Sequence, residues 1–129
     1  MADKRERSAR FVEEHHLLDL TRFVVMMLLY DRPDDVDAYC ADLLTDLIEG
    51  RYKDEIPLYS KDEIEEMFKQ YLLPKASTID PKQARECLLS MGIPDYISNG
   101  FFEGEKPVEI NDFVENAIEA LHKRIEQWK

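Results

Sequence analysis

The clearest helical pattern in the chain lies at residues 36–50, which carry the sequence VDAYCADLLTDLIEG. Its apolar residues recur every three or four positions, at Val36, Tyr39, Cys40, Leu43, Leu44, Leu47 and Ile48. This spacing places them on one face of an α-helix. Asp34 or Asp35 can cap its start, and Gly50 stands where a left-handed C-terminal cap is expected. The stretch therefore predicts an amphipathic helix that packs against another element.

The segment before it is predicted to be a helix that begins near a Ser8 cap and ends at about Asp31. Arg32-Pro33 should end it, because a residue that precedes proline is disfavoured in the helical conformation. Residues 23–29, FVVMMLL, leave this helix almost no polar face. A helix that is apolar all round must be covered on all sides. We expect a second copy of the chain and a partner to cover it, unless the C-terminal half folds back instead.

The rest of the chain also shows helical periods, and no stretch of alternating residues predicts a full strand. Ser60 with Glu63 has the spacing of a capping box at the start of one helix. Asp80-Pro81 starts the next helix, with proline at the first helical position and Gln83 at the third. Asn111 is expected to cap a last helix. The sequence thus predicts an all-α chain with domains at 8–50 and 60–129, joined by a linker at 51–59.

Composition narrows the possible partners and the location of the chain. The 129 residues include 28 acidic and 17 basic side chains, for a net charge of −11, which disfavours binding to nucleic acid and to anionic membranes. The longest apolar run, residues 23–30, is far shorter than the about 20 residues that span a bilayer. No secretory signal starts the chain. Cys40 and Cys87 both lie in apolar helical patterns and are interpreted as reduced core residues of a cytoplasmic protein.

The sequence contains no pattern typical of an enzyme or of a cofactor site. No phosphate-binding loop, catalytic serine motif or zinc motif occurs. Adjacent histidines at 15 and 16 would point to different sides of a helix and could not chelate one ion. A nucleophilic pair of Cys87 and His122 is disfavoured because Cys87 lies in an apolar stripe. We therefore expect neither an enzyme nor a bound cofactor.

The N-terminal patterns together resemble a known domain family. Residues 11–44 resemble the dimerisation and docking domain of the type II regulatory subunit of cAMP-dependent protein kinase (RIIα type). The matching residues are Leu17, Leu18, Leu20, Leu28 and Leu29, then Arg32-Pro33-Asp34-Asp35, then Tyr39 and Leu43. The resemblance implies a helical hairpin that forms an X-type four-helix bundle as a dimer and binds an amphipathic helix in a groove.

Carried over residue by residue, the resemblance assigns two sets of positions. The partner-helix groove would be lined by Leu18, Thr21, Arg22, Val25, Met26 and Leu29. The dimer core would contain Leu17, Leu20, Val24, Leu28, Val36, Tyr39 and Leu43. Arg22 places a charge in a mostly apolar groove, which favours a dedicated partner over the usual kinase anchors. The second subunit would be another copy or a different docking-domain chain.

Residues 60–129 resemble a degenerate EF-hand pair. Ile79 and Ile110 would hold the positions that pair the two loops, and residues 78–80 and 109–111 would form their short ribbon. In that alignment neither loop supplies the oxygen ligands that calcium requires. No metal site is predicted, although Glu103, Glu105 and Asn111 are weak candidates. The alternative function is a calcium-responsive regulator that uses the second loop.

A docking hairpin followed by a degenerate EF-hand pair is similar to small ciliary proteins of the EF-hand-containing class. The resemblance implies a non-catalytic adaptor that dimerises and binds an amphipathic helix of a scaffold or axonemal protein. It also implies a place in the axoneme of a cilium or flagellum.

Overall fold

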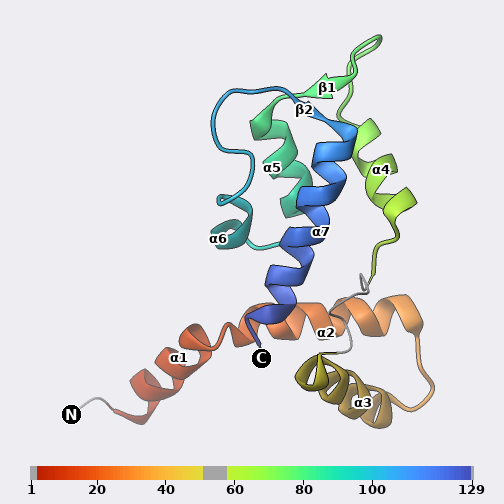
Figure 1. The fold of residues 1–129 in the computed structure, drawn as a ribbon. Coiled ribbons are helices and arrows are strands. Elements are labelled where there is room, and N and C mark those ends of the chain that lie inside the picture. The colour runs from red at the N-terminus through yellow and green to blue at the C-terminus, as the bar shows by residue number, and fades with distance from the viewer. Residues whose placement is uncertain (1–2, 51–57, 129) are drawn as a thin grey trace. The chain divides into compact units, whose positions relative to one another are not determined.

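The computed structural model describes residues 3–50 and 58–128 and shows a mostly helical chain (Figure 1). The predicted linker at 51–59 lies largely outside the described residues. Contacts divide the chain into two compact units. Unit 1 comprises Met1–Lys53 and Ile125–Lys129, and unit 2 comprises Asp54–Arg124. The all-α class is confirmed for the described residues, where the strands form a single two-stranded ribbon.

Unit 1 contains three whole helices. They are α1 (Lys4–Glu14), α2 (Leu17–Asp31) and α3 (Val36–Glu49). The prediction of one helix from Ser8 to Asp31 was wrong in two respects. The Asp3 carboxylate accepts a hydrogen bond from the Glu6 amide at 2.8 Å, so the helix begins earlier than Ser8. The helix is then interrupted at His16, whose φ of 52° is left-handed.

The turn between α2 and α3 confirms the prediction from the Arg32-Pro33 sequence. Helix α2 ends at Asp31, and Arg32 takes a left-handed φ of 47° while its amide bonds the Leu28 carbonyl at 2.8 Å. Asp35 is the cap of α3 and accepts a hydrogen bond from the Ala38 amide at 3.0 Å. Gly50 ends α3 with a φ of 73°, a conformation that glycine adopts without steric cost. Local sequence therefore determines this turn.

The hairpin of α2 and α3 has a small core. Phe23 and Met27 of α2 and Leu43 and Leu47 of α3 are its buried apolar side chains. The Tyr39 hydroxyl is within hydrogen-bonding distance of the Met27 carbonyl and of the Asp31 carboxylate, which ties α3 to the end of α2. This core uses only one stripe of the apolar helix α2.

Unit 2 contains two helix–loop–helix segments joined by the ribbon (Figure 1). Its elements are α4 (Lys61–Lys69), β1 (Thr78–Ile79), α5 (Pro81–Ser90), α6 (Asp95–Ser98), β2 (Val108–Glu109) and α7 (Ile110–Glu126), the last of which ends in unit 1. The predicted capping box of Ser60 and Glu63 is present, and Asp80, the predicted start of α5, also forms a capping box with Gln83. Helix α4 ends at Lys69, earlier than the predicted stop at Pro74.

The ribbon differs from its predicted register. Ile79 pairs with Val108 and Thr78 with Glu109, so Val108, rather than Ile110, holds the pairing position. Ile110 instead begins α7 directly after β2. Asn111 consequently lies inside the first turn of α7, and its predicted role as the cap was wrong. The observed pairing therefore shifts the alignment of the second loop by two positions from the predicted one.

The core of unit 2 is larger than that of unit 1. Phe68 of α4 and Phe113 of α7 have ring centroids 5.5 Å apart, and Phe102 stacks on Phe113 at 5.8 Å. The buried cluster is formed by Ile64, Phe68, Ile79, Ala84, Cys87, Leu88, Met91, Ile93, Phe101, Val108, Phe113, Val114, Ala117, Ala120 and Leu121. These residues come from both helix–loop–helix segments, so the two segments share one core.

Candidate docking surfaces

The outer face of α2 is the most apolar exposed helix face of unit 1. Leu18 is 67% exposed, Val25 is 47% exposed and Leu29 is 68% exposed. These residues are separated by seven and four positions and therefore share one side of the helix. Arg22 and Thr21 lie between them and are also exposed. Five of the six residues predicted to line a partner groove thus lie on this free face, and Met26 is half-buried beside it.

The residues predicted for a dimer core occupy different environments in a single chain. Leu17, Leu20, Val24 and Leu28 of α2 are half-buried. Val36 is exposed and Tyr39 is half-buried, whereas Leu43 is already buried in the hairpin. Leu43 therefore stabilises the α2–α3 hairpin within a single chain. Leu17, Leu20, Val24 and Leu28 of α2 retain partly exposed apolar surface.

Gln127 and Trp128, near the C-terminus, belong to unit 1 and contact the break between α1 and α2 and the start of α2. The Trp128 indole nitrogen donates a hydrogen bond to the His16 carbonyl at 3.3 Å, and the Trp128 ring lies 5.3 Å from that of Phe23. The Gln127 amide donates to the Asp19 carboxylate at 2.8 Å. Asp19 is the buried acid of α2, and a buried carboxylate requires such donors.

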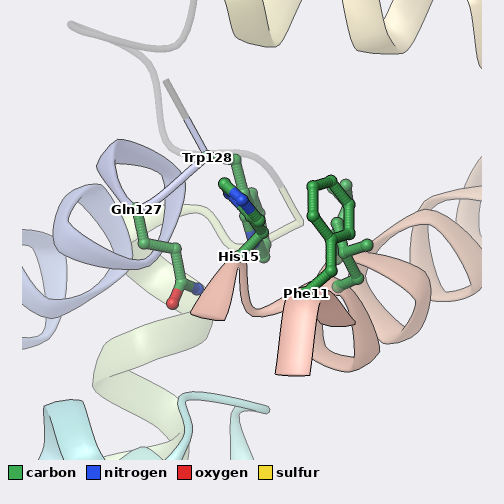
Figure 2. A pocket seen from close by; sticks show the side chains of 6 residues that line it. Phe11, His15, Gln127 and Trp128 are labelled. Atoms are coloured by element: carbon green, nitrogen blue, oxygen red, sulfur yellow. The ribbon is translucent and has the colours of Figure 1, made fainter. Parts of the chain in front are cut away.

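A pocket of about 220 Å³ lies beside this contact. Figure 2 shows Phe11, His15, Gln127 and Trp128 around it, and Leu17 and Leu20 complete its wall. The Phe11 and His15 rings lie with their centroids 4.3 Å apart and their planes tilted by 46°. The sequence patterns did not reveal this pocket, because its walls come from opposite ends of the chain. Trp128 was predicted only as part of an apolar stripe on the last helix.

Helix α1 is mostly exposed, and Val12 is its one half-buried residue. No residue of it is buried, and Phe11 is 55% exposed. A shallow hollow on one side of α1 is lined by Lys4, Arg7, Ser8, Phe11 and Val12. Isolated helices shorter than about 12 residues are marginal in water. An uncovered helix of 11 residues therefore calls for contacts beyond those it makes here.

Cys87, which lies in the apolar stripe predicted from the sequence, is buried in the core of unit 2. Burial raises the pKa of the Cys87 thiol from 9.0 to about 11, so the thiol is protonated at neutral pH. A protonated thiol is a poor nucleophile. His15 and His16 lie at a helix break instead of within a helix, contrary to the prediction.

The ribbon register also changes the alignment of the second loop with a calcium site. With Val108 in the pairing position, the side-chain ligand positions fall on Phe101, Glu103, Glu105, Glu109 and Asp112. The first position is then a buried aromatic ring, and Asn111 is no longer a ligand position. In residues 3–50 and 58–128, no three histidine, cysteine or acidic side chains are grouped as a metal site would require.

Comparison with known proteins adds no family to these observations. No family model matches the chain, and no curated protein or solved structure gives a significant match. Within the described part of the chain, no helix is both long enough and apolar enough to cross a membrane.

Proposed function

We propose that this chain is a non-catalytic adaptor that dimerises through residues 8–50 and binds an amphipathic helix of a partner on the outer face of α2. The observation that carries the proposal is the exposed row of Leu18, Val25 and Leu29. Contiguous exposed apolar side chains are typical of interaction sites. A helix presents apolar anchors at the same three- and four-residue spacing, which fits a helix-in-groove mode.

Arg22 gives the proposed groove a charge preference. It is exposed and lies on the apolar face between Leu18 and Val25. An acidic residue on the docked helix, placed among its apolar anchors, would pair with the guanidinium. The aliphatic part of Arg22 would meanwhile pack against the neighbouring side chains. The proposed partner is therefore an amphipathic helix with an acid on its apolar side.

A display library of amphipathic helical peptides, selected against the whole chain, tests this proposal. Selected peptides should bind the native chain, and Val25→Glu should weaken their binding about tenfold or more because it buries a charge in the groove. Leu89→Glu is the matched control, since Leu89 is 45% exposed and Val25 is 47% exposed. The groove is ruled out if Val25→Glu and Leu89→Glu bind the selected peptides equally well.

The dimer has its own test, the solution molar mass of the whole chain. A mass of twice 15.2 kDa supports self-association, and 15.2 kDa alone at micromolar concentration contradicts it. The axonemal location is supported by the sequence resemblance and is tested by imaging a fluorescently tagged chain in a ciliated cell. Exclusion of the tagged chain from the axoneme would remove that part of the proposal.

A further inference from the structure

Helix α1 and helix α3 carry opposite charge patterns. Helix α1 has four basic residues, Lys4, Arg5, Arg7 and Arg10, against three acidic ones. Helix α3 has four acidic residues, Asp37, Asp42, Asp46 and Glu49, and no basic one. By these side chains α1 has a net charge of +1 and α3 a net charge of −4, in a chain whose net charge is −11. Opposite charges of this kind guide the pairing of two surfaces.

The two helices also expose matching rows of side chains. On α1 the row is Lys4, Ser8, Phe11 and His15, and on α3 it is Asp37, Ala41, Leu44 and Ile48. The steps along both rows are four, three and four residues, so each row lies on one side of its helix. All eight residues are exposed in a single chain, with Phe11 at 55%, Leu44 at 40% and Ile48 at 74%.

Laid parallel, the two rows are complementary at each step. Lys4 meets the acid Asp37, the small Ser8 meets the small Ala41, and the Phe11 ring meets Leu44. The fourth pair places the His15 ring against Ile48. Helix α1 is about 16 Å long and α3 is about 21 Å long. The first three pairs lie within both helices, and the fourth uses His15, the C-cap residue directly after α1. The hollow at Lys4, Arg7, Ser8, Phe11 and Val12 would receive the side chains of α3.

We infer that α1 of one copy docks in parallel on the exposed face of α3 of a second copy. The inference rests on the proposed dimer, but it does not involve the partner-helix groove on α2. Each copy supplies one α1 and one α3, so a two-fold dimer forms the contact twice. The contact covers the exposed helix α1 and the apolar residues Leu44 and Ile48 together.

Disulfide cross-linking between two different chains tests the inference directly. Both chains carry Cys40→Ala, which removes the half-exposed native thiol. One chain then carries Phe11→Cys, and the other, with a tag of different mass, carries Leu44→Cys. A disulfide requires Cα atoms within about 7 Å, so oxidation of the mixture should give a mixed covalent dimer. Arg10→Cys in place of Phe11→Cys is the control, and it should give little mixed dimer.

A charge exchange gives a second, independent measurement. Lys4→Glu with Arg7→Glu should raise the dissociation constant of the dimer about tenfold or more, measured by light scattering over a dilution series. Arg5→Glu with Arg10→Glu makes the same change in net charge on other sides of α1 and should have a much smaller effect. Adding Asp37→Lys to the Lys4→Glu single variant should recover part of the affinity lost by that variant.

The outcomes separate this inference from the proposed function. A dimeric chain that gives no mixed covalent species, or that responds equally to both charge pairs, overturns the α1–α3 contact and leaves the dimer in place. A cross-link found only within one chain carrying both Phe11→Cys and Leu44→Cys also overturns it. If the native chain is monomeric, both the dimer of the proposed function and the α1–α3 contact are wrong. Binding of helical peptides to α2 is measured separately.

Discussion

Units 1 and 2 are both built from amphipathic helices, yet they differ in how much apolar surface they leave exposed. In the described part of unit 2 the large exposed apolar side chains are Leu73, Leu89 and Tyr96. In the described part of unit 1 they are Phe11, Leu18, Val25, Leu29, Tyr30, Val36, Leu44 and Ile48. The smaller unit therefore exposes the larger number of apolar groups.

The difference follows from how many helices in each unit pack against one another's apolar faces. Unit 2 brings helices from two segments around one core, so most apolar stripes find a neighbour. Unit 1 has an almost wholly apolar helix, α2, and α3 covers one side of it. Small units bury a smaller fraction of their surface and often need a partner. Unit 1 thus leaves more of its apolar side chains exposed than unit 2 does.

The largest expected effect is on the closed core of unit 2. Phe68 is fully buried against Phe113, so Phe68→Ala should lower the free energy of unfolding by about 3–5 kcal/mol. Urea denaturation followed by circular dichroism measures the change. Leu73→Ala, at a site that is 72% exposed, is the control and should change it by less than about 0.5 kcal/mol. Equal losses would show that unit 2 has no closed core.

The alkylation rate of the Cys87 thiol tests whether the same core is closed, and it requires no mutation. Its raised pKa of about 11 should make alkylation by iodoacetamide in the folded protein about 100-fold slower than in urea, because two pKa units reduce the thiolate fraction by that factor. Mass spectrometry of the Cys87 peptide measures the rate. Fast modification in the folded protein would mean that the core opens readily.

The next effect concerns the contact that completes unit 1. Trp128→Ala removes the ring contact with Phe23 and the hydrogen bond to His16, and should cost about 1–3 kcal/mol of unfolding free energy. Trp128→Phe keeps an aromatic ring and should cost less. Hydrogen exchange of the α2 amides measures both changes. An unchanged exchange rate in Trp128→Ala would show that the C-terminal residues do not stabilise α2.

A smaller change in stability is expected on the outer face of α2. Leu29 is 68% exposed, so Leu29→Ser should alter the free energy of unfolding by less than about 0.5 kcal/mol. The same variant should bind selected helical peptides about tenfold more weakly, because the leucine side chain is buried only in the complex. Leu89→Ser is the control for both measurements. A large loss of stability would show that Leu29 belongs to the core of unit 1.

The smallest expected effect is that of calcium. If the second loop is aligned with a calcium-binding loop, the observed register places Phe101 at the first ligand position, so calcium at millimolar concentration should give no binding heat in a calorimetric titration. Glu105→Gln should behave like the native chain. Saturable binding that Glu105→Gln weakens would instead support the alternative function of a calcium-responsive regulator.

The success of the sequence predictions depended on the distance between the interacting residues. The capping box at Ser60, the helix start at Asp80 and the turn at Arg32-Pro33 were predicted correctly, because their partners lie within four residues. The predicted groove residues Leu18, Val25 and Leu29 do share one exposed face. The predicted core residue Leu43 is buried within its own hairpin, which helical spacing alone could not show.

The amino-acid sequence by itself determined the helices, most of their caps and the excess of apolar surface on α2, because these depend on local hydrogen bonds and on residue spacing. Only the tertiary structure determined the break at His16, the contact of Trp128 with Phe23 and the pairing of Ile79 with Val108. These features join residues far apart in the chain. Residue spacing within one helix does not specify such contacts, so they depend on the packing of side chains that are distant in sequence.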